Sequence, residues 1–235
     1  RLTAGATVTK ALSCAAPPAS NATIEVTIDG GTAPYNYVVK NNVGTILFTS
    51  GPVTGPKFTY DAANSGNYTF DITDSNNCTT STNQTVNPTV PVTAKATVTD
   101  VTCFNADNGS VVLEGLTGEA PFQFNFNNGG FSTTATYSNL PGSVAGITYN
   151  YIVRDNKGCT ESYTITVKQP AAITASASIS TPYTCDGPAT ITATASNGNG
   201  APYTFTLLRG ATTVASNTTG IFGNISVAGS YTVTA

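Results

Sequence analysis

Three landmarks recur in the same order along the chain, and this internal repeat constrains the fold more than any other feature. They are a cysteine after an alternating segment, an Ala-Pro-aromatic step after a turn, and an alternating segment that opens with tyrosine. The cysteines lie 89 and 82 residues apart and the prolines 87 and 81, so we predict three tandem copies of one unit. The landmarks begin at Cys14, Cys103 and Cys185; at Ala33, Ala120 and Ala201; and at Tyr68, Tyr149 and Tyr231.

Each copy has the pattern of short β-strands. Ile24, Val26 and Ile28 alternate before the first Pro step, and side chains two apart share one face of a strand. Glycine-rich turns such as residues 29–31 supply the positive φ that tight connections need. No capped segment of ten or more residues shows helical periodicity. We predict an all-β fold of three tandem immunoglobulin-like or fibronectin-like β-sandwich modules.

Proline-containing segments separate the copies. Residues 87–91 and 168–170 are short and favour extended backbone, so we expect stiff joints. The third copy stops within an alternating pattern at residues 231–235, and we expect this module to be truncated. The predicted modules span residues 1–88, 89–170 and 171–235.

Five cysteines and the absence of histidine favour disulfides over metal or catalysis. Without histidine or a Cys-x-x-Cys pair, zinc and Cys–His chemistry lack their usual ligands and base. The repeat phase pairs Cys14 with Cys78 and Cys103 with Cys159, which ties the first strand of each module to the start of its last. Each such loop would stabilise its module by about 4 kcal/mol. The phase places the partner of Cys185 beyond the last residue, so we expect Cys185 to be unpaired by truncation.

The charge pattern argues against two classes of partner. Charged residues make up 9% of the chain, and the basic ones are scattered singly. Nucleic acids and anionic membranes are bound by clustered Lys and Arg, and a bilayer is spanned by about 18 or more apolar residues. We predict no nucleic-acid partner and no membrane insertion.

The carboxylates show no catalytic or metal-binding pattern. Asp71 and Asp74 lie three apart on a strand and would point to opposite faces. We interpret Asp74 and Asp155 as turn residues whose side chains accept backbone N–H groups. The chain is therefore predicted to be no enzyme and to hold no metal or cofactor. Calcium between modules is the weaker alternative, because the acidic residues near module ends lack an Asp-x-Asp-x-Asp pattern: Asp100, Asp107, Asp155 and Asp186.

Aromatic residues divide by their phase in the repeat. Tyr35, Phe122 and Tyr203 recur in phase, so we expect them at core or corner positions. Aromatics outside the shared pattern are the better candidates for an exposed sugar-binding platform: Phe48, Phe58, Phe104, Phe131 and Phe222.

The strand-ending cysteine, the step at residues 30–35 (GGTAPY) and the closing element at residues 151–160 (YIVRDNKGCT) together resemble the SprB repeat. That family builds long cell-surface adhesins of gliding bacteria of the Bacteroidetes type. The resemblance covers essentially the whole chain and implies export by the type 9 secretion system, an extracellular cell-surface location, and a role in adhesion or gliding motility. Asn77 replaces the glycine before Cys78, at a left-handed position that Asn tolerates.

On this resemblance, the expected function is a structural stalk segment of a long secreted adhesin, used in surface attachment or gliding motility. Its expected partners are neighbouring repeats of the same chain, with surface glycans or other cell-surface proteins as further candidates. Two alternatives stay open. One is a carbohydrate-binding module array of a secreted protein, and the other is a subunit of a self-assembling extracellular filament or sheath joined through open edge strands.

Overall fold

The computed structural model describes residues 1–15 and 20–235, and these residues form strands and turns with no helix among them. The strands fall into three groups, and each group forms two sheets of its own. We call these groups module 1 (β1–β7), module 2 (β8–β14) and module 3 (β15–β20). The predicted all-β fold of sandwich type is confirmed, whereas the module boundaries at residues 88 and 170 stay predictions.

The described chain also divides into two compact units that cut across module 2. The first contains residues 1–95, 113–135 and 150–163. The second contains residues 96–112, 136–149 and 164–235. Each unit is described by itself below.

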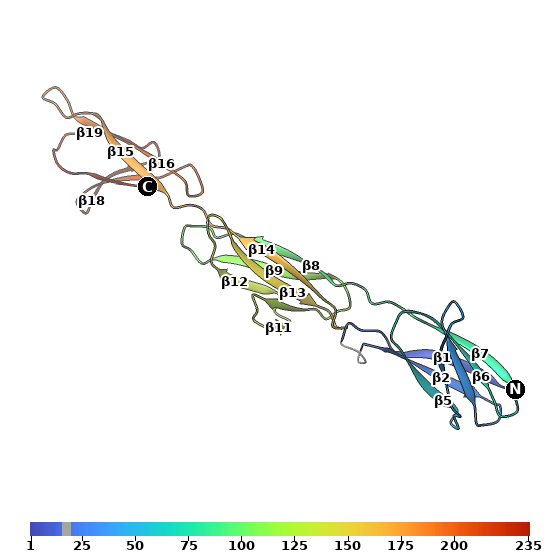
Figure 1. The fold of residues 1–235 in the computed structure, drawn as a ribbon. Coiled ribbons are helices and arrows are strands. Elements are labelled where there is room, and N and C mark those ends of the chain that lie inside the picture. The colour runs from blue at the N-terminus through green and yellow to red at the C-terminus, as the bar shows by residue number, and fades with distance from the viewer. Residues whose placement is uncertain (16–19) are drawn as a thin grey trace. The chain divides into compact units, whose positions relative to one another are not determined.

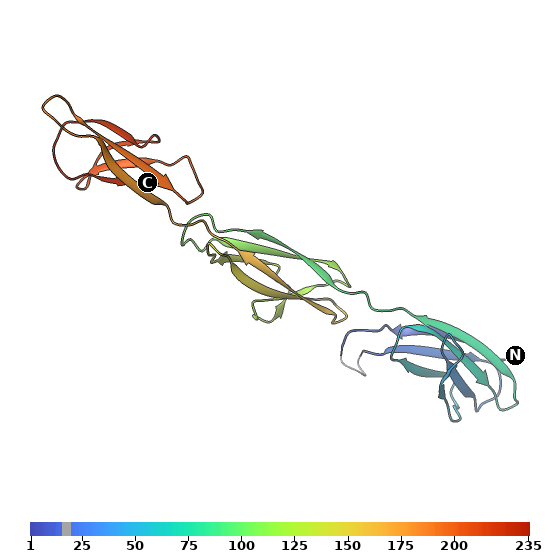
Figure 2. The same cartoon turned by 45° about the horizontal axis from the view of Figure 1, so that its top comes forward.

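Module 1 consists of two antiparallel sheets. One has the strand order β1-β2-β5 and the other the order β4-β3-β6-β7. Figure 1 labels most of these strands, and Figure 2 shows the same blue to teal ribbon turned by 45°. The strands are β1 (Thr3–Lys10), β2 (Ala22–Asp29), β3 (Asn36–Lys40), β4 (Ile46–Thr49), β5 (Lys57–Ala62), β6 (Gly66–Thr73) and β7 (Thr79–Val86).

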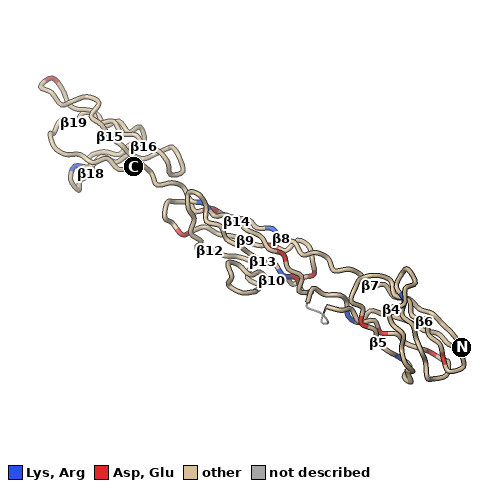
Figure 3. Tube along the Cα trace, in the orientation of Figure 1, with Lys and Arg blue, Asp and Glu red and all other residues tan. Residues whose placement is uncertain are grey.

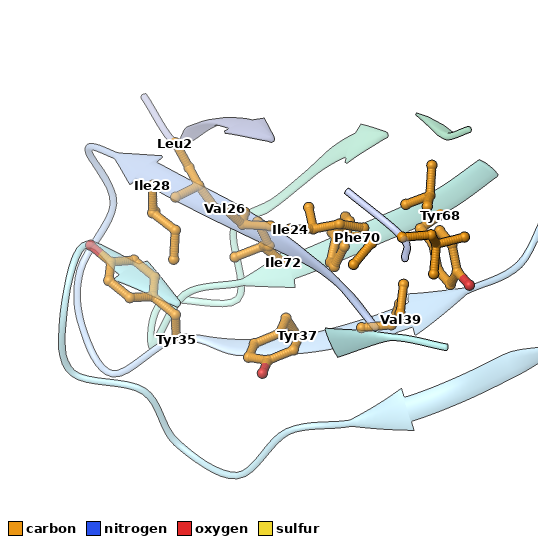
Figure 4. Packing of buried hydrophobic residues seen from close by; sticks show 14 residues of the cluster. Leu2, Ile24, Val26, Ile28, Tyr35, Tyr37, Val39, Tyr68, Phe70 and Ile72 are labelled. Atoms are coloured by element: carbon orange, nitrogen blue, oxygen red, sulfur yellow. The ribbon is translucent and has the colours of Figure 1, made fainter. Parts of the chain in front are cut away.

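The core of module 1 follows the predicted alternation. Ile24 and Val26 of β2 and Phe70 and Ile72 of β6 are fully buried. Figure 4 shows these side chains together with Val39 of β3 in the space between the strands. Because side chains two apart share one face, each strand supplies one apolar face to the core and turns its Thr, Glu and Asp side chains outward.

Modules 2 and 3 repeat this plan with differences in strand number. Module 2 has sheets β12-β9-β8 and β11-β10-β13-β14, and module 3 has sheets β15-β16-β19 and β18-β17-β20. In module 2 the strands are β8 (Thr93–Thr99), β9 (Gly109–Thr117), β10 (Gln123–Phe126), β11 (Phe131–Ser132), β12 (Thr136–Leu140), β13 (Ile147–Arg154) and β14 (Thr160–Val167). In module 3 they are β15 (Thr174–Thr181), β16 (Ala189–Ser196), β17 (Phe205–Arg209), β18 (Thr212–Asn217), β19 (Ile221–Ile225) and β20 (Thr232–Thr234).

Two of the landmarks adopt the same local structure in every module. The peptide bonds before Pro34, Pro121 and Pro202 are all cis. The hydroxyl of each landmark tyrosine donates to a backbone carbonyl earlier in the chain, as in the tyrosine corner of related sandwiches. These hydrogen bonds join Tyr68 to Asn64 (2.7 Å), Tyr149 to Pro141 (3.0 Å) and Tyr231 to Val227 (2.8 Å).

The register of module 1 defines its two ends. We call the proximal end the one where β1 begins; Thr3 pairs there with Asp29, the last residue of β2. The turn at residues 74–78 lies at the same end, because Ser75 N–H donates to Thr32 O in the β2–β3 connection (2.9 Å). We call the other end distal; β1 ends there, where Lys10 pairs with Thr23.

Candidate functional site

A disulfide bond joins module 1 to module 2. It links Cys14, in the segment after β1, to Cys159, in the turn between β13 and β14. The two Cα atoms lie 4.7 Å apart, and 145 positions separate the cysteines in the sequence. Cys14 N–H also donates to Lys157 O (2.9 Å), so a backbone hydrogen bond reinforces the covalent link. The whole arrangement lies within the first compact unit.

A buried aspartate shapes the turn that carries Cys159. Asp155 is 5% exposed, and its Oδ1 accepts the backbone N–H groups of Lys157 and Cys159 at 2.9 Å each. Its Oδ2 accepts the N–H of Glu119 from the β9–β10 connection (3.1 Å). The carboxylate therefore fixes the cysteine backbone and ties the turn to the neighbouring loop.

Glu119 holds the same turn from outside. Its carboxylate pairs with Lys157 Nζ (2.8 Å) and accepts from Asn156 Nδ2 (3.4 Å), while its carbonyl accepts from Asn156 N–H (2.8 Å). The hydrogen bonds from Lys157 and Asn156 and the charge of Lys157 lower the pKa of Glu119 below its ordinary value. Glu119 is therefore ionised at neutral pH, which keeps this ion pair intact.

The equivalent turn of module 1 has the same structure. Asp74 is 4% exposed; its Oδ1 accepts from Asn76 and Cys78 N–H (2.9 Å each), and its Oδ2 accepts from Thr32 N–H (3.0 Å). Asn77 has a φ of 63°, in the same left-handed region as Gly158 at 77°. The predicted turn roles of Asp74 and Asp155 and the Asn-for-Gly substitution are confirmed.

The predicted disulfide between Cys14 and Cys78 is wrong, because the two residues lie at opposite ends of module 1. Cys78 lies in the turn at the proximal end, whereas Cys14 follows β1 at the distal end. The eight-residue strand β1 separates these ends by about 25 Å. A disulfide requires Cα atoms within about 7 Å.

The predicted disulfide between Cys103 and Cys159 fails for the same reason. Cys159 directly precedes β14, whereas Val101, two residues before Cys103, donates its N–H to Lys168 O directly after β14 (2.8 Å). The two cysteines therefore lie near opposite ends of an eight-residue strand. Among the cysteines, all of which are described, Cys78, Cys103 and Cys185 form no disulfide and are exposed.

The candidate sugar-binding aromatics differ in exposure. Phe104 and Phe48 are exposed, at 47% and 44%. Phe58 is half-buried and stacks on Tyr37 with a centroid distance of 3.6 Å. The ring of half-buried Phe131 is covered by the Arg154 guanidinium at 3.9 Å.

Phe222 contradicts the expectation of exposure. It is 3% exposed and pairs with Ile191 in the β16–β19 register, which turns it into the core of module 3. Of the aromatics expected in the core, Tyr35 is buried and donates its hydroxyl hydrogen to Gly30 O (2.9 Å). Phe122 and Tyr203 are half-buried.

Charged residues form no extended patch of one sign. Figure 3 shows the blue and red positions as short separate stretches of the tube. In the described residues no group of three or more His, Cys, Asp or Glu side chains could hold a metal ion. Asp100, one of the acidic residues considered for calcium, instead accepts the N–H of Lys168 (2.7 Å). Residues 1–15 and 20–235 contain no helix of the length and apolarity needed to span a bilayer.

The solved structures similar to this chain resemble it weakly. The fibronectin(III)-like modules of Clostridium thermocellum CbhA share 16% identity at a TM-score of 0.31, over 72% of this chain and 95% of that one. The C-terminal 282-residue fragment of intimin, in complex with the translocated intimin receptor domain, shares 13% identity at a TM-score of 0.33, over 74% and 66%. A tetra-tandem repeat from the extending region of a large adhesion protein shares 16% identity at a TM-score of 0.28, over 96% and 66%. We transfer no function from these proteins.

The sequence comparisons identify the repeat itself. No curated protein matches this chain. The SprB repeat family matches residues 6–44 and 95–131. These segments contain the first cysteine and the Ala-Pro-aromatic step of modules 1 and 2, in equivalent strands of the two sandwiches. The chain is therefore a tandem β-sandwich array that contains SprB repeats, in module 1 and again in module 2.

Proposed function

We propose that this chain is a load-bearing stalk segment of a secreted cell-surface adhesin, exported by the type 9 secretion system and used in surface attachment or gliding motility. The observation that carries the proposal is the disulfide between modules 1 and 2. A link within one sandwich protects only that sandwich, whereas this link continues the covalent path from one module to the next.

The covalent path determines how the chain carries tension. A force applied at residues 1 and 235 runs through residues 1–14, crosses the disulfide and continues through residues 159–235. Residues 15–158 carry no tension along this path, so most of modules 1 and 2 is protected from extension. A spacer between a cell and a surface benefits from this arrangement, because pulling cannot lengthen the protected modules.

Two further features support an extracellular stalk. Disulfides form and persist in oxidising compartments such as the cell exterior. The scarcity of charge, at 9% of residues, suits a spacer that must avoid nonspecific ionic contacts. The presence of SprB repeats, which resemble those of gliding-bacterium adhesins, supports attachment and motility as the process served.

Single-molecule stretching tests the mechanical part of the proposal. The chain is held at residues 1 and 235 and pulled to full extension with and without a reductant. Reduction is expected to add about 500 Å of length, because it releases 145 residue positions. Equal full extensions before and after reduction would contradict the proposal.

The surface location has its own test. An antibody raised against this chain is expected to label intact cells of the producing bacterium as strongly as lysed cells. Labelling that appears only after lysis would contradict a cell-surface stalk. Loss of attachment or gliding when the segment is replaced by a flexible linker of equal length would support the mechanical role.

One observation favours glycan binding as a second candidate. Phe48 on β4 is 44% exposed, and its ring lies 5.8 Å from the ring of Tyr37 and 6.3 Å from that of Tyr60. An exposed ring supported by others is the kind of platform on which sugars stack. Glycan-array binding that is lost in Phe48→Ala and retained in Phe131→Ala would favour this function, and an array without any bound glycan would count against it.

A further inference from the structure

The disulfide between modules 1 and 2 joins cysteines of two different types. Cys14 belongs to the type that follows the first strand of a module, with Cys103 and Cys185 as its equivalents. We call these leading cysteines. Cys159 belongs to the type that ends the Asp-capped turn before the last strand, with Cys78 as its equivalent. We call these closing cysteines.

We propose that every leading cysteine pairs with the closing cysteine of the following repeat, so that disulfides connect the array as a ladder of links between modules. Cys103 would then bind the closing cysteine that completes module 3, Cys185 the one in the repeat after it, and Cys78 the leading cysteine of a repeat before module 1. The proposal concerns only the pairing and does not depend on the adhesive role of the protein.

Strand geometry requires this pairing. A leading cysteine lies at the distal end of its module and a closing cysteine at the proximal end, about 25 Å away along an eight-residue strand. The two cysteines of one module therefore cannot meet. In a tandem chain the last strand of a module returns to its distal end, since Val86 of β7 pairs with Gly66. The next module begins from that end, which brings a closing cysteine to each leading one.

The second compact unit shows the next site in this series. The loop that contains Cys103 lies against the β16–β17 connection of module 3, where Asn199 Nδ2 donates to Thr102 O (2.8 Å). By alignment on the cis prolines, Asn199 corresponds to Gly118, the residue before Glu119 in module 2. In module 2 that connection is the one that binds the Asp-capped turn through Glu119 N–H. The distal loop of module 2 thus already lies beside the place where a closing turn of module 3 would attach.

A hollow marks the vacant position. It has a volume of about 360 Å³ and is open to solvent beside exposed Cys103. Phe104, Ile173 and Asn199 are among its lining residues. We assign the hollow to the closing turn of module 3, by equivalence with the position of residues 155–159 beside Cys14.

Formation of the bond is ordinary thiol–disulfide exchange. The thiolate of one cysteine attacks a sulfur of oxidised glutathione, the oxidant, and releases one glutathione thiolate. The second cysteine thiolate attacks the mixed disulfide and releases the other glutathione. One protein disulfide forms, two thiols of the protein lose their protons and two electrons, and one oxidised glutathione is reduced to two thiols.

The test completes module 3 with the closing element of module 2. The extended chain carries the sequence of residues 154–167 directly after Ala235, because Ala235 corresponds to Val153 in the repeat. Its added cysteine then lies six residues after Ala235, as Cys159 lies six after Val153. The protein is oxidised in a glutathione buffer, alkylated, digested without reduction and mapped by mass spectrometry.

The ladder predicts a peptide that links Cys103 to the added cysteine. Cys14–Cys159 should persist, and the number of free thiols should fall from the three of the original chain to two. A bond between Cys185 and the added cysteine would overturn the proposal, and so would an added cysteine that stays free in a chain with intact β-sheet circular dichroism. In the extended chain with Cys103→Ser, the added cysteine should stay unpaired; its transfer to Cys185 would also overturn the ladder.

A second variant does not depend on the folding of the extension. Asn199→Cys in the original chain places a thiol where the side chain now contacts the Thr102 carbonyl. We expect it to pair with Cys103 and to leave two free thiols. Four free thiols would show that the distal loop of module 2 does not meet module 3, which contradicts the ladder.

Discussion

Modules 1 and 3 carry the same landmarks, yet their first strands differ in burial. In β1, Ala4, Ala6 and Val8 are half-buried and pack against the core. In β15, every residue is exposed, including Ile179 at 67%. The difference lies in the last strand, because β7 contacts β1 in module 1 and no described strand of module 3 takes that position. A hollow of about 220 Å³, lined in part by Ile179 and Tyr231, lies beside β15. The first strand of this repeat therefore depends on the last one for its burial.

The cores differ in the same sense. Four aromatic residues are fully enclosed in module 1, against two among the described residues of module 3: Tyr35, Tyr37, Tyr68 and Phe70, compared with Phe205 and Phe222. Burial of apolar surface is the main stabilising contribution, at about 25 cal/mol per Å². Module 1 also has a disulfide, and module 3 has none in the described chain. We expect module 3 to unfold first.

The largest expected effect is removal of the disulfide. Cys159→Ser should lower the free energy of unfolding of the linked modules by about 5 kcal/mol, because the bond closes a loop of 145 positions in the unfolded chain. Module 3 should be unaffected. Urea unfolding followed by hydrogen exchange in each module measures both. Cys78→Ser is the matched control, and an equal loss in that variant would contradict the assigned pairing.

The second effect separates the two cores. Phe70 and Leu207 are each fully buried, in modules 1 and 3. Phe70→Ala should cost about 3–5 kcal/mol and Leu207→Ala about 2–5 kcal/mol, each confined to the unfolding of its own module. Exchange rates of amides in β6 and β17 report the two transitions separately. If Phe70→Ala also loosened β17, modules 1 and 3 would form one cooperative unit and the comparison would fail.

The third effect is gained by completing module 3. The extended chain, with serine at its added cysteine to exclude a disulfide, should cover Ile179 and stabilise module 3 by about 2 kcal/mol. Amides of β15 should then exchange as slowly as those of β1. Fast exchange in β15 after the extension would show that its exposure has another cause than the missing strand.

The smallest effect is the acid sensitivity of module 1. Burial by itself raises the pKa of Asp74, but the backbone N–H groups of Cys78, Thr32 and Asn76 outweigh it and hold the pKa below its ordinary value of about 3.9. The stabilisation is thus complete above that value and is lost as the pH falls through the lower pKa of the folded state.

Asp74→Asn should lower the denaturation midpoint of module 1 at pH 7, and the gap to the unmodified chain should close as the pH falls below about 3. Asp71→Asn, on the exposed side of β6, is the control with a smaller effect at pH 7. A gap for Asp74→Asn that does not depend on pH would show that the carboxylate charge is not what binds the turn.

The sequence predicts the repeat, the alternation of Ile24, Val26 and Ile28, and the turn roles of Asp74 and Asp155, because each depends on local spacing. It does not predict the disulfide. Spacing shows that Cys14 and Cys103 are equivalent, but only the pairing of β1 with β2 shows at which end of the sandwich each cysteine lies. The burial of Phe222 likewise depends on its register opposite Ile191, which no local pattern contains.

The central claim is that the disulfide runs between modules and not within one. Non-reducing peptide mapping of the oxidised, alkylated chain tests it most directly. The structure predicts one linked peptide pair, Cys14 with Cys159, and alkylated thiols at Cys78, Cys103 and Cys185. Linked peptides that join Cys14 to Cys78, or Cys103 to Cys159, would contradict it.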